Sequence, residues 1–121
     1  MRIISFAWTT PALLAGRKTC TRRDWMADYA QRFTVGELVA AYDRSPRAGG
    51  KQVAVIRLTA DPILSNELPA KDWAAEGFDY LEEIGAKVNG NTPLQLWDAW
   101  FKTKPYQWIV RFEVVEEEPS K

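Results

Sequence analysis

Runs of β-branched and aromatic residues predict strands along the chain, separated by clusters of turn-forming residues. Four such runs stand out, at residues 3–8, 38–42, 52–59 and 106–115, and residues 19–24 are extended by composition. The segment between the second and third runs, residues 43–51, has the sequence DRSPRAGGK. Because it combines turn-forming residues with cations, it predicts a hairpin with a basic tip.

Helical patterns occur mainly between the third and fourth strand runs. Residues 69–76 form a short pattern that stops before Gly77. The sequences Asp79-x-x-Glu82 and Thr92-Pro93-x-Gln95 both fit capping boxes, so each predicts the start of a further helix. The first of these helices is expected to end near residues 85–89. The second is expected to present one apolar face formed by Leu94, Trp97 and Phe101.

Two short segments near the N-terminus complete the pattern. Residues 11–15 predict a helix of little more than one turn, because Thr10-Pro11 is a helix start and Gly16 stands where a C-terminal cap belongs. Residues 25–33 fit either a short helix or an ordered loop.

The order of elements is strand, short helix, extended segment, hairpin, helices and strand. Since this order lacks βαβ alternation, it predicts an α+β fold with a small antiparallel sheet or barrel and short helices packed to one side. At 121 residues the chain is expected to form a single domain over residues 1–121. Residues 116–121 are expected to be a frayed tail.

Composition narrows the protein class. With 46% hydrophobic and 26% charged residues, the chain fits a globular protein. Charges interrupt every apolar run before about 18 residues, so no membrane segment is expected. The N-terminus lacks the pattern of a signal peptide, which predicts a cytoplasmic location. The single cysteine, Cys20, cannot form an internal disulfide and is expected to be a small core residue.

The absence of histidine excludes several kinds of site. Without it, neither a Ser-His-Asp nor a Cys-His pair can form, so a general base must be Lys, Glu, Asp or Tyr. With one cysteine and no histidine, the usual zinc ligand sets are also excluded, and no metal is expected. No glycine-rich phosphate loop occurs, and no cofactor is expected.

The formal charge is zero, but it is unevenly distributed. Residues 1–51 hold nine Lys or Arg against four acids (+5), and residues 52–121 hold seven against twelve (−5). A basic surface would attract phosphate or a nucleic-acid backbone. Alternatively, the oppositely charged halves face one another or scatter over the surface.

The most informative motif is residues 14–24, LAGRKTCTRRD. It resembles the signature of the ASCH superfamily, whose PUA-like β-barrel proteins carry Gly-x-Lys-x-x-Glu-x-Arg just after a short helix. Gly16, Lys18 and Arg23 occupy the Gly, Lys and Arg positions. Thr21 replaces the acid, as it does in the small bacterial N4-acetylcytidine amidohydrolases of this superfamily. In those enzymes the Lys and Thr work with a downstream Glu, which the resemblance places at Glu76.

Removing an acyl group from the exocyclic amine of cytosine requires attack on an amide carbonyl, stabilisation of an oxyanion and protonation of the departing amine. Thr21 is a candidate nucleophile or water holder, and Lys18 a candidate base if burial or neighbouring arginines lower its pKa. Glu76 would shuttle the proton or hold the base. Arg23 is a candidate oxyanion or phosphate ligand, or an anchor for Asp24. In a regular strand, however, Lys18 and Thr21 would point to opposite faces.

Each of these residues also has a structural interpretation. Lys18 and Arg22 fit solvated surface cations, Thr21 an ordinary strand residue, and Glu76 a solvated acid. Among the six tryptophans, those expected near the site are Trp8, Trp25 and Trp73, whose rings could stack on a base. The other three, Trp97, Trp100 and Trp108, are expected to pack between the last helix and the last strand.

Three hypotheses follow. The first is an amidohydrolase that acts on an N-acylated nucleoside or nucleotide through Lys18, Thr21 and Glu76. The second is a module that binds RNA or a modified base, in which cations converge with Trp8 or Trp25 on one groove. Those cations are Arg22, Arg44, Arg47 and Lys51, and the full predicted binding set is Trp8, Gly16, Arg22, Arg23, Trp25, Arg44 and Arg47. The third is a protein-interaction domain with an exposed apolar patch.

Overall fold

The computed structural model describes residues 1–117. Its strands are β1 (Arg2–Ser5), β2 (Cys20–Arg23), β3 (Leu38–Tyr42), β4 (Gln52–Leu58), β5 (Ile63–Ser65) and β6 (Gln107–Glu117). Its α-helices are α1 (Thr10–Leu14), α2 (Ala27–Ala30), α3 (Asp72–Ala75), α4 (Phe78–Glu83) and α5 (Pro93–Thr103). Two 3-10 helices are η1 (Ala7–Thr9) and η2 (Pro46–Ala48).

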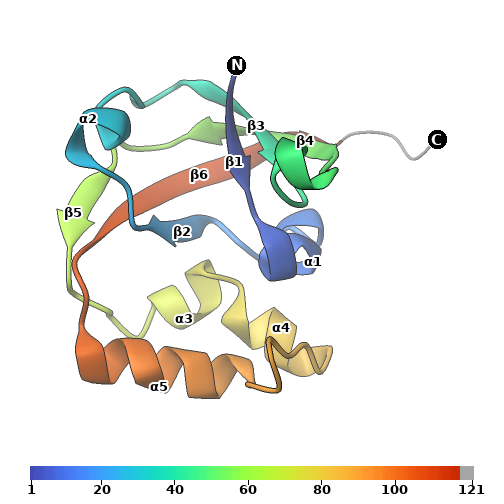
Figure 1. The fold of residues 1–121 in the computed structure, drawn as a ribbon, viewed down its shortest axis with the longest axis vertical. Helices are drawn as coiled ribbons and strands as arrows, with labels where there is room; N and C mark the ends of the chain where they lie inside the picture. The colour runs from blue at the N-terminus through green and yellow to red at the C-terminus, as the bar shows by residue number, and fades with distance from the viewer. Residues whose placement is uncertain (118–121) are drawn as a thin grey trace.

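The strands form one curled sheet in the order β1-β3-β4-β6-β2, with β5 also paired to β6 (Figure 1). Strand β6 is the longest element of the sheet, and it pairs with β4 along one part and with β2 and β5 along another. All pairs are antiparallel except β1 and β3, which are parallel. The predicted α+β architecture is therefore confirmed, but its sheet is mixed.

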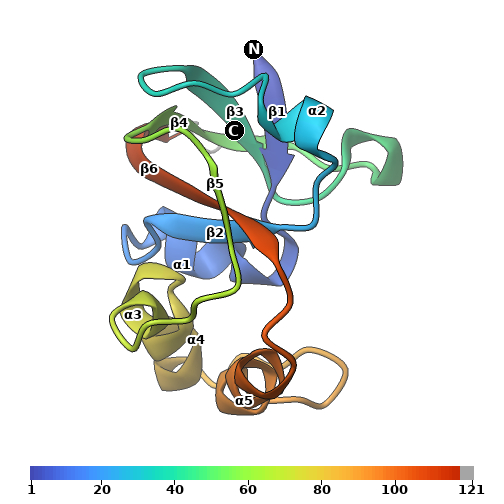
Figure 2. The same cartoon turned by 90° about the vertical axis from the view of Figure 1, so that its left-hand side faces the viewer.

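Four helices gather at one end of the sheet, whereas α2 lies apart from them. Figures 1 and 2 show α1, α3, α4 and α5 together on the side of β2. Two apolar clusters meet at α1: Leu13 belongs to the sheet cluster that contains Phe112, and Ala12 belongs to the helical cluster that contains Phe78. Because α1 is packed into both clusters, the residues that follow it are held between the sheet and the helices.

Several predicted boundaries differ from the observed ones. The first strand ends at Ser5, and residues 7–9 form η1. The helix predicted from Asp79-x-x-Glu82 is present as α4, but its capping box is wrong, because α4 begins at Phe78 after Gly77 and Asp79 lies inside the helix. Its carboxylate instead pairs with Arg17. Strand β5 was not predicted at all.

The C-terminal elements confirm one prediction and correct two. The Thr92 and Gln95 capping box is present at the start of α5. The predicted face of this helix is wrong, since Leu94 and Phe101 are 48% and 53% exposed. The residues that pack are Leu96, Trp97 and Trp100. Glu116 and Glu117, predicted as tail, belong to β6, and residues 118–121 lie outside the described residues.

Candidate active site

A cavity of about 200 Å³ lies where η1, the start of β2 and the helices meet. Its wall includes polar side chains from Thr9, Lys18, Thr21, Arg22, Arg23 and Glu76. Its apolar wall includes Phe6, Trp8, Phe78 and Trp100. The structure therefore brings the three predicted catalytic residues to one cavity, although they come from two distant parts of the chain.

Lys18 reaches this cavity because it precedes strand β2. Gly16 has a φ of +72°, a left-handed turn that glycine adopts without strain, and it redirects the chain after α1. The Thr19 N–H then donates to the Ala75 carbonyl at 2.8 Å, which ties this segment to α3. Since Lys18 lies outside the strand, side-chain alternation does not separate it from Thr21, and both line the same cavity.

Lys18 and Glu76 form a buried ion pair, with side chains only 1% and 2% exposed. The Lys18 Nζ donates to the Glu76 Oε1 at 3.0 Å and to the Glu76 carbonyl oxygen at 2.9 Å. Burial lowers the pKa of the Lys18 ammonium, although the Glu76 carboxylate acts in the opposite direction. The ammonium that pairs with Glu76 therefore gives up its proton more readily than that of an exposed lysine. Neither residue is the solvated surface group of the structural interpretation.

Glu76 is held in place by the tight junction between α3 and α4. Gly77 has a φ of +83°, and a Cβ built there would lie 2.6 Å from the Ala12 Cβ and 3.2 Å from the Lys18 Cβ. Only glycine therefore lets the α3–α4 turn approach α1 this closely. The Glu76 Oε2 accepts a 2.7 Å hydrogen bond from Arg22 and a contact of 3.7 Å from the Cys20 thiol.

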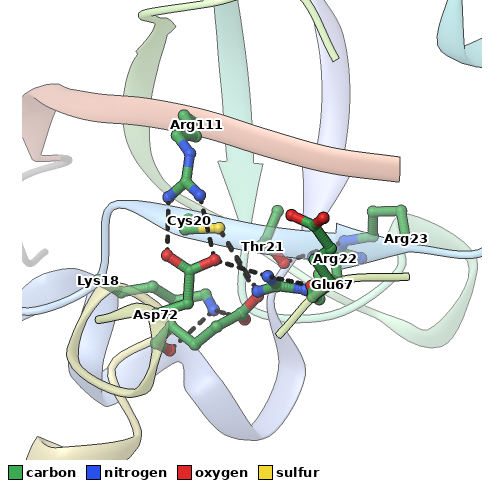
Figure 3. A network of polar contacts seen from close by, with 9 residues as sticks. Lys18, Cys20, Thr21, Arg22, Arg23, Glu67, Asp72 and Arg111 are labelled. Carbon is green, nitrogen blue, oxygen red and sulfur yellow. Dashed lines mark hydrogen bonds and ion pairs between the residues drawn. The ribbon is translucent and has the colours of Figure 1, made fainter. Parts of the chain in front are cut away.

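A second buried carboxylate, that of Asp72, extends the polar network (Figure 3). It accepts from Arg22 at 2.6 Å and from both terminal nitrogens of Arg111 on β6 at 3.1 and 3.0 Å. Burial alone would raise the pKa of Asp72, but the hydrogen bonds from Arg111 and Arg22 outweigh it and hold the pKa below its usual range. Arg22 is thus a buried structural cation.

The hydroxyl of Thr21 is oriented by Arg23. The Arg23 Nε donates to the Thr21 Oγ1 at 3.2 Å, and its terminal nitrogen donates to the Ser5 carbonyl at 2.6 Å. The guanidinium also lies over the Phe6 ring, 5.4 Å from the centroid. In Figure 3, Thr21 and Arg23 lie beside each other along β2. Because Thr21 accepts through its oxygen, its hydrogen is free to be donated to another group.

No protein-family model matches the chain, and no curated protein matches it. Solved structures do match. Protein EF3133 from Enterococcus faecalis V583, described with the family model DUF984, has a TM-score of 0.61 and 19% identity over 99% of this chain and 83% of that one. The ASCH domain from Lactobacillus crispatus JV V101 has a TM-score of 0.54 and 15% identity over 95% of this chain and 79% of that one. The chain has an ASCH-like fold. At these identities the likeness concerns the fold.

Within this ASCH-like fold, the predicted aromatic residues separate into two groups. Trp8 lines the cavity, as predicted. Trp25 instead stacks on Phe33 with centroids 4.7 Å apart, and its carbonyl accepts from the Trp108 indole. Trp73 packs edge-on against Phe78 and Trp97.

The prediction for the last helix is wrong for Trp100, which lines the cavity beside Phe78. Trp97 packs among the helices and Trp108 contacts Trp25, so neither forms the predicted seam. The spacing of apolar residues in α5 did not indicate Trp100, because it favoured the face with Leu94 and Phe101 over the face that packs.

The predicted convergence of cations on one groove is not found. Arg44, Arg47 and Lys51 are exposed in the β3–β4 connection and are not among the residues that line the cavity. Gly16 is exposed, and its role in the structure is the turn described above. Arg23 bonds to Ser5 rather than anchoring Asp24. Cys20 is fully buried, and burial raises the pKa of its thiol to about 12, so it is a poor nucleophile.

Two further features are absent from residues 1–117. None of their helices has the length and apolarity needed to cross a bilayer. Within the same part of the chain, no group of three or more Cys, Asp or Glu side chains is placed to hold a metal ion.

Proposed function

We propose that the cavity hydrolyses an N-acyl group from a modified nucleoside or nucleotide of the N4-acylcytidine type. The observation that carries this proposal is the buried Lys18–Glu76 ion pair, which shares a cavity wall with the Thr21 hydroxyl. A buried lysine of lowered pKa in the same cavity as a hydroxyl is an arrangement that suits acyl transfer.

In the proposed reaction, the Lys18 Nζ accepts the proton of the Thr21 hydroxyl while the Thr21 oxygen bonds to the acyl carbon. The carbonyl electron pair moves to its oxygen, and Arg23 supplies positive charge beside the attacking group. The C–N bond then breaks, and the Lys18 ammonium returns the proton to the departing exocyclic amine. Water finally cleaves the Thr21 ester and releases the carboxylic acid. If Thr21 instead holds the water, the same proton transfers apply without the ester.

Glu76 serves this scheme by holding Lys18 through two of its oxygen atoms. The fixed amine faces the cavity in one geometry, which reduces the reorganisation needed at the moment of proton transfer. The flat rings of Trp8, Phe78 and Trp100 in the cavity wall suit stacking on one nucleobase.

A second candidate function is recognition of a modified base or RNA without cleavage. It is favoured by the same aromatic wall, because tryptophan rings stack on bases. The exposed cations of the β3–β4 connection lie away from this wall, so the cavity would read a single base rather than a long groove.

The test is a chromatographic assay of N4-acylated cytidines, offered as nucleosides and within short RNA and DNA. We expect the wild type to release cytidine and Lys18→Met, Thr21→Val and Glu76→Gln to lose activity by at least a hundredfold, while Thr21→Ser retains a measurable part. The exposed Lys102→Met variant is the matched control.

Circular dichroism establishes that the inactive variants are folded, and mass spectrometry of quenched reactions detects the acyl group on Thr21. A wild-type protein that leaves every substrate intact refutes the hydrolase. A salt-dependent titration with the same oligonucleotides then tests the binding module.

A further inference from the structure

Arg22 links the proposed site to a second ion pair outside the cavity wall. One terminal nitrogen donates to the Glu76 Oε2 at 2.7 Å, and the other donates to the Asp72 Oδ2 at 2.6 Å. Both carboxylates are buried, and Arg22 also donates to the Glu67 carbonyl at 3.3 Å. Arg22 therefore has little freedom to move relative to Glu76.

Asp72 is fixed in turn by Arg111, whose guanidinium binds both carboxylate oxygens. This two-point geometry sets the orientation of the carboxylate as well as its position. Arg111 comes from β6, directly opposite Cys20 in the sheet register, and its side chain is 35% exposed. A chain of alternating charges thus runs from the surface of β6 to the cavity: Arg111, Asp72, Arg22, Glu76 and Lys18. Figure 3 labels all of these residues except Glu76.

We propose that Asp72 and Arg111 are positioning residues for the reaction proposed above. They hold Arg22 on Glu76 and thereby set the electric field and the geometry that the Lys18 amine experiences. The catalytic meaning of this inference rests on the proposed function, whereas the effect on Lys18 exists without any substrate.

The direction of the effect follows from the groups around Lys18. These are Glu76 at the end of α3 and Cys20, Arg22 and Arg23 from β2, while Asp79 of α4 is paired with Arg17. Replacing Arg111 by glutamine removes a positive charge and leaves Arg22 as the cation paired with Asp72. Arg22 then binds Asp72 more tightly and Glu76 more weakly, so the Glu76 charge acts more strongly on Lys18. Both effects favour the ammonium. Replacing Asp72 by asparagine disfavours the ammonium, because a negative charge is lost and Glu76 becomes the remaining carboxylate partner of Arg22.

These opposite directions distinguish positioning from simple loosening of the fold. Local opening would hydrate Lys18 in both variants and favour the ammonium in both. If the charges act as proposed, the pKa of Lys18 rises in Arg111→Gln and falls in Asp72→Asn. Each shift should be about one unit, a tenfold change in proton affinity.

The experiment is NMR titration of the full chain with ¹³C-labelled lysine. The chain has seven lysines, and Lys18 is assigned by the signal lost in Lys18→Met. Arg57→Gln is the matched control, because it removes an arginine from an exposed ion pair with Glu113. Arg111→Lys retains the charge and should shift Lys18 by less than a third of the Arg111→Gln value.

Equal upward shifts in Asp72→Asn and Arg111→Gln, or no shift in either, overturn the proposal. If Asp72→Asn does not fold, the comparison of Arg111→Gln with Arg111→Lys decides, since similar shifts in the two exclude a charge effect. In an active protein, the acidic limb of the rate profile should move with the Lys18 titration. A wild type without activity refutes the proposed function, and the titration still tests the network.

Discussion

Replacing Lys18 and replacing Glu76 in the buried ion pair should lower the stability of the protein by different amounts. The network contains three cations, Lys18, Arg22 and Arg111, and two acids, Glu76 and Asp72. Lys18→Met leaves two cations facing two acids, and Glu76 keeps Arg22 as its partner. Glu76→Gln leaves three cations facing the single charge of Asp72. Glu76→Gln should therefore be the more damaging change.

The magnitudes follow from the bonds that are lost. Leaving a buried charge without its partner costs about 3–5 kcal/mol, which we expect for Glu76→Gln. In Lys18→Met the methionine keeps an apolar side chain of similar length. What is lost is the two hydrogen bonds from Lys18 to the carbonyl and carboxylate oxygens of Glu76. We expect about 2 kcal/mol there. The double variant should lose less than the sum, because each change removes the same interaction.

Urea unfolding followed by circular dichroism at neutral pH measures these losses. Arg57→Gln, which breaks an exposed pair, should change the free energy of unfolding by less than about 1 kcal/mol. Equal losses for the two single variants, or a larger loss for Lys18→Met, would refute the charge balance on which the prediction depends.

Three further predictions concern stability and reactivity. The pKa of Asp72 is lower in the folded than in the unfolded protein, so its ionised form stabilises the fold above the unfolded pKa. This contribution is lost as the pH falls through the folded pKa. Urea midpoints measured between about pH 2 and 6 should therefore fall less steeply for Asp72→Asn than for the wild type. Gly77→Ala should lower stability by about 2–4 kcal/mol, because its Cβ would clash with Ala12, whereas Gly16→Ala, which meets nothing within 4 Å, should lose only about 1 kcal/mol in thermal unfolding. The Cys20 thiol, whose pKa burial raises to about 12, should react with a thiol reagent at pH 8 at least a hundredfold more slowly in the native protein than in urea, and similar rates would contradict its burial.

Local signals in the sequence located the parts of the site that depend on nearby residues. The capping box at Thr92 and the left-handed turn at Gly16 are set by the chain within a few positions, and both are present. The resemblance of residues 14–24 pointed to Glu76, which lies 58 residues after Lys18 and forms its ion pair. The burial that lowers the pKa of Lys18 depends on tertiary packing, which no local sequence pattern encodes.

Long-range contacts explain what the sequence did not reveal. Asp72 and Arg111 are 39 residues apart and meet only because the fold brings the Arg111 side chain from β6 within reach of the start of α3. The predicted helix α4 is present, but Asp79 does not cap it, because Gly77 precedes the helix in a left-handed conformation and packs against Ala12. Trp100 reaches the cavity because α5 presents a face one residue away from the predicted one.

A buried ion pair is seldom the most stable way to fill an interior. Apolar side chains of the same volume are often as stabilising, or more so by about 1–4 kcal/mol. Lys18 and Glu76 lie beside Phe78 in the cavity wall, next to an apolar cluster in which such side chains would pack. Stability alone does not account for an amine and a carboxylate in this place. The proposed function accounts for them, because the pair lines the same cavity as Thr21 and is held there by residues from both the sheet and the helices.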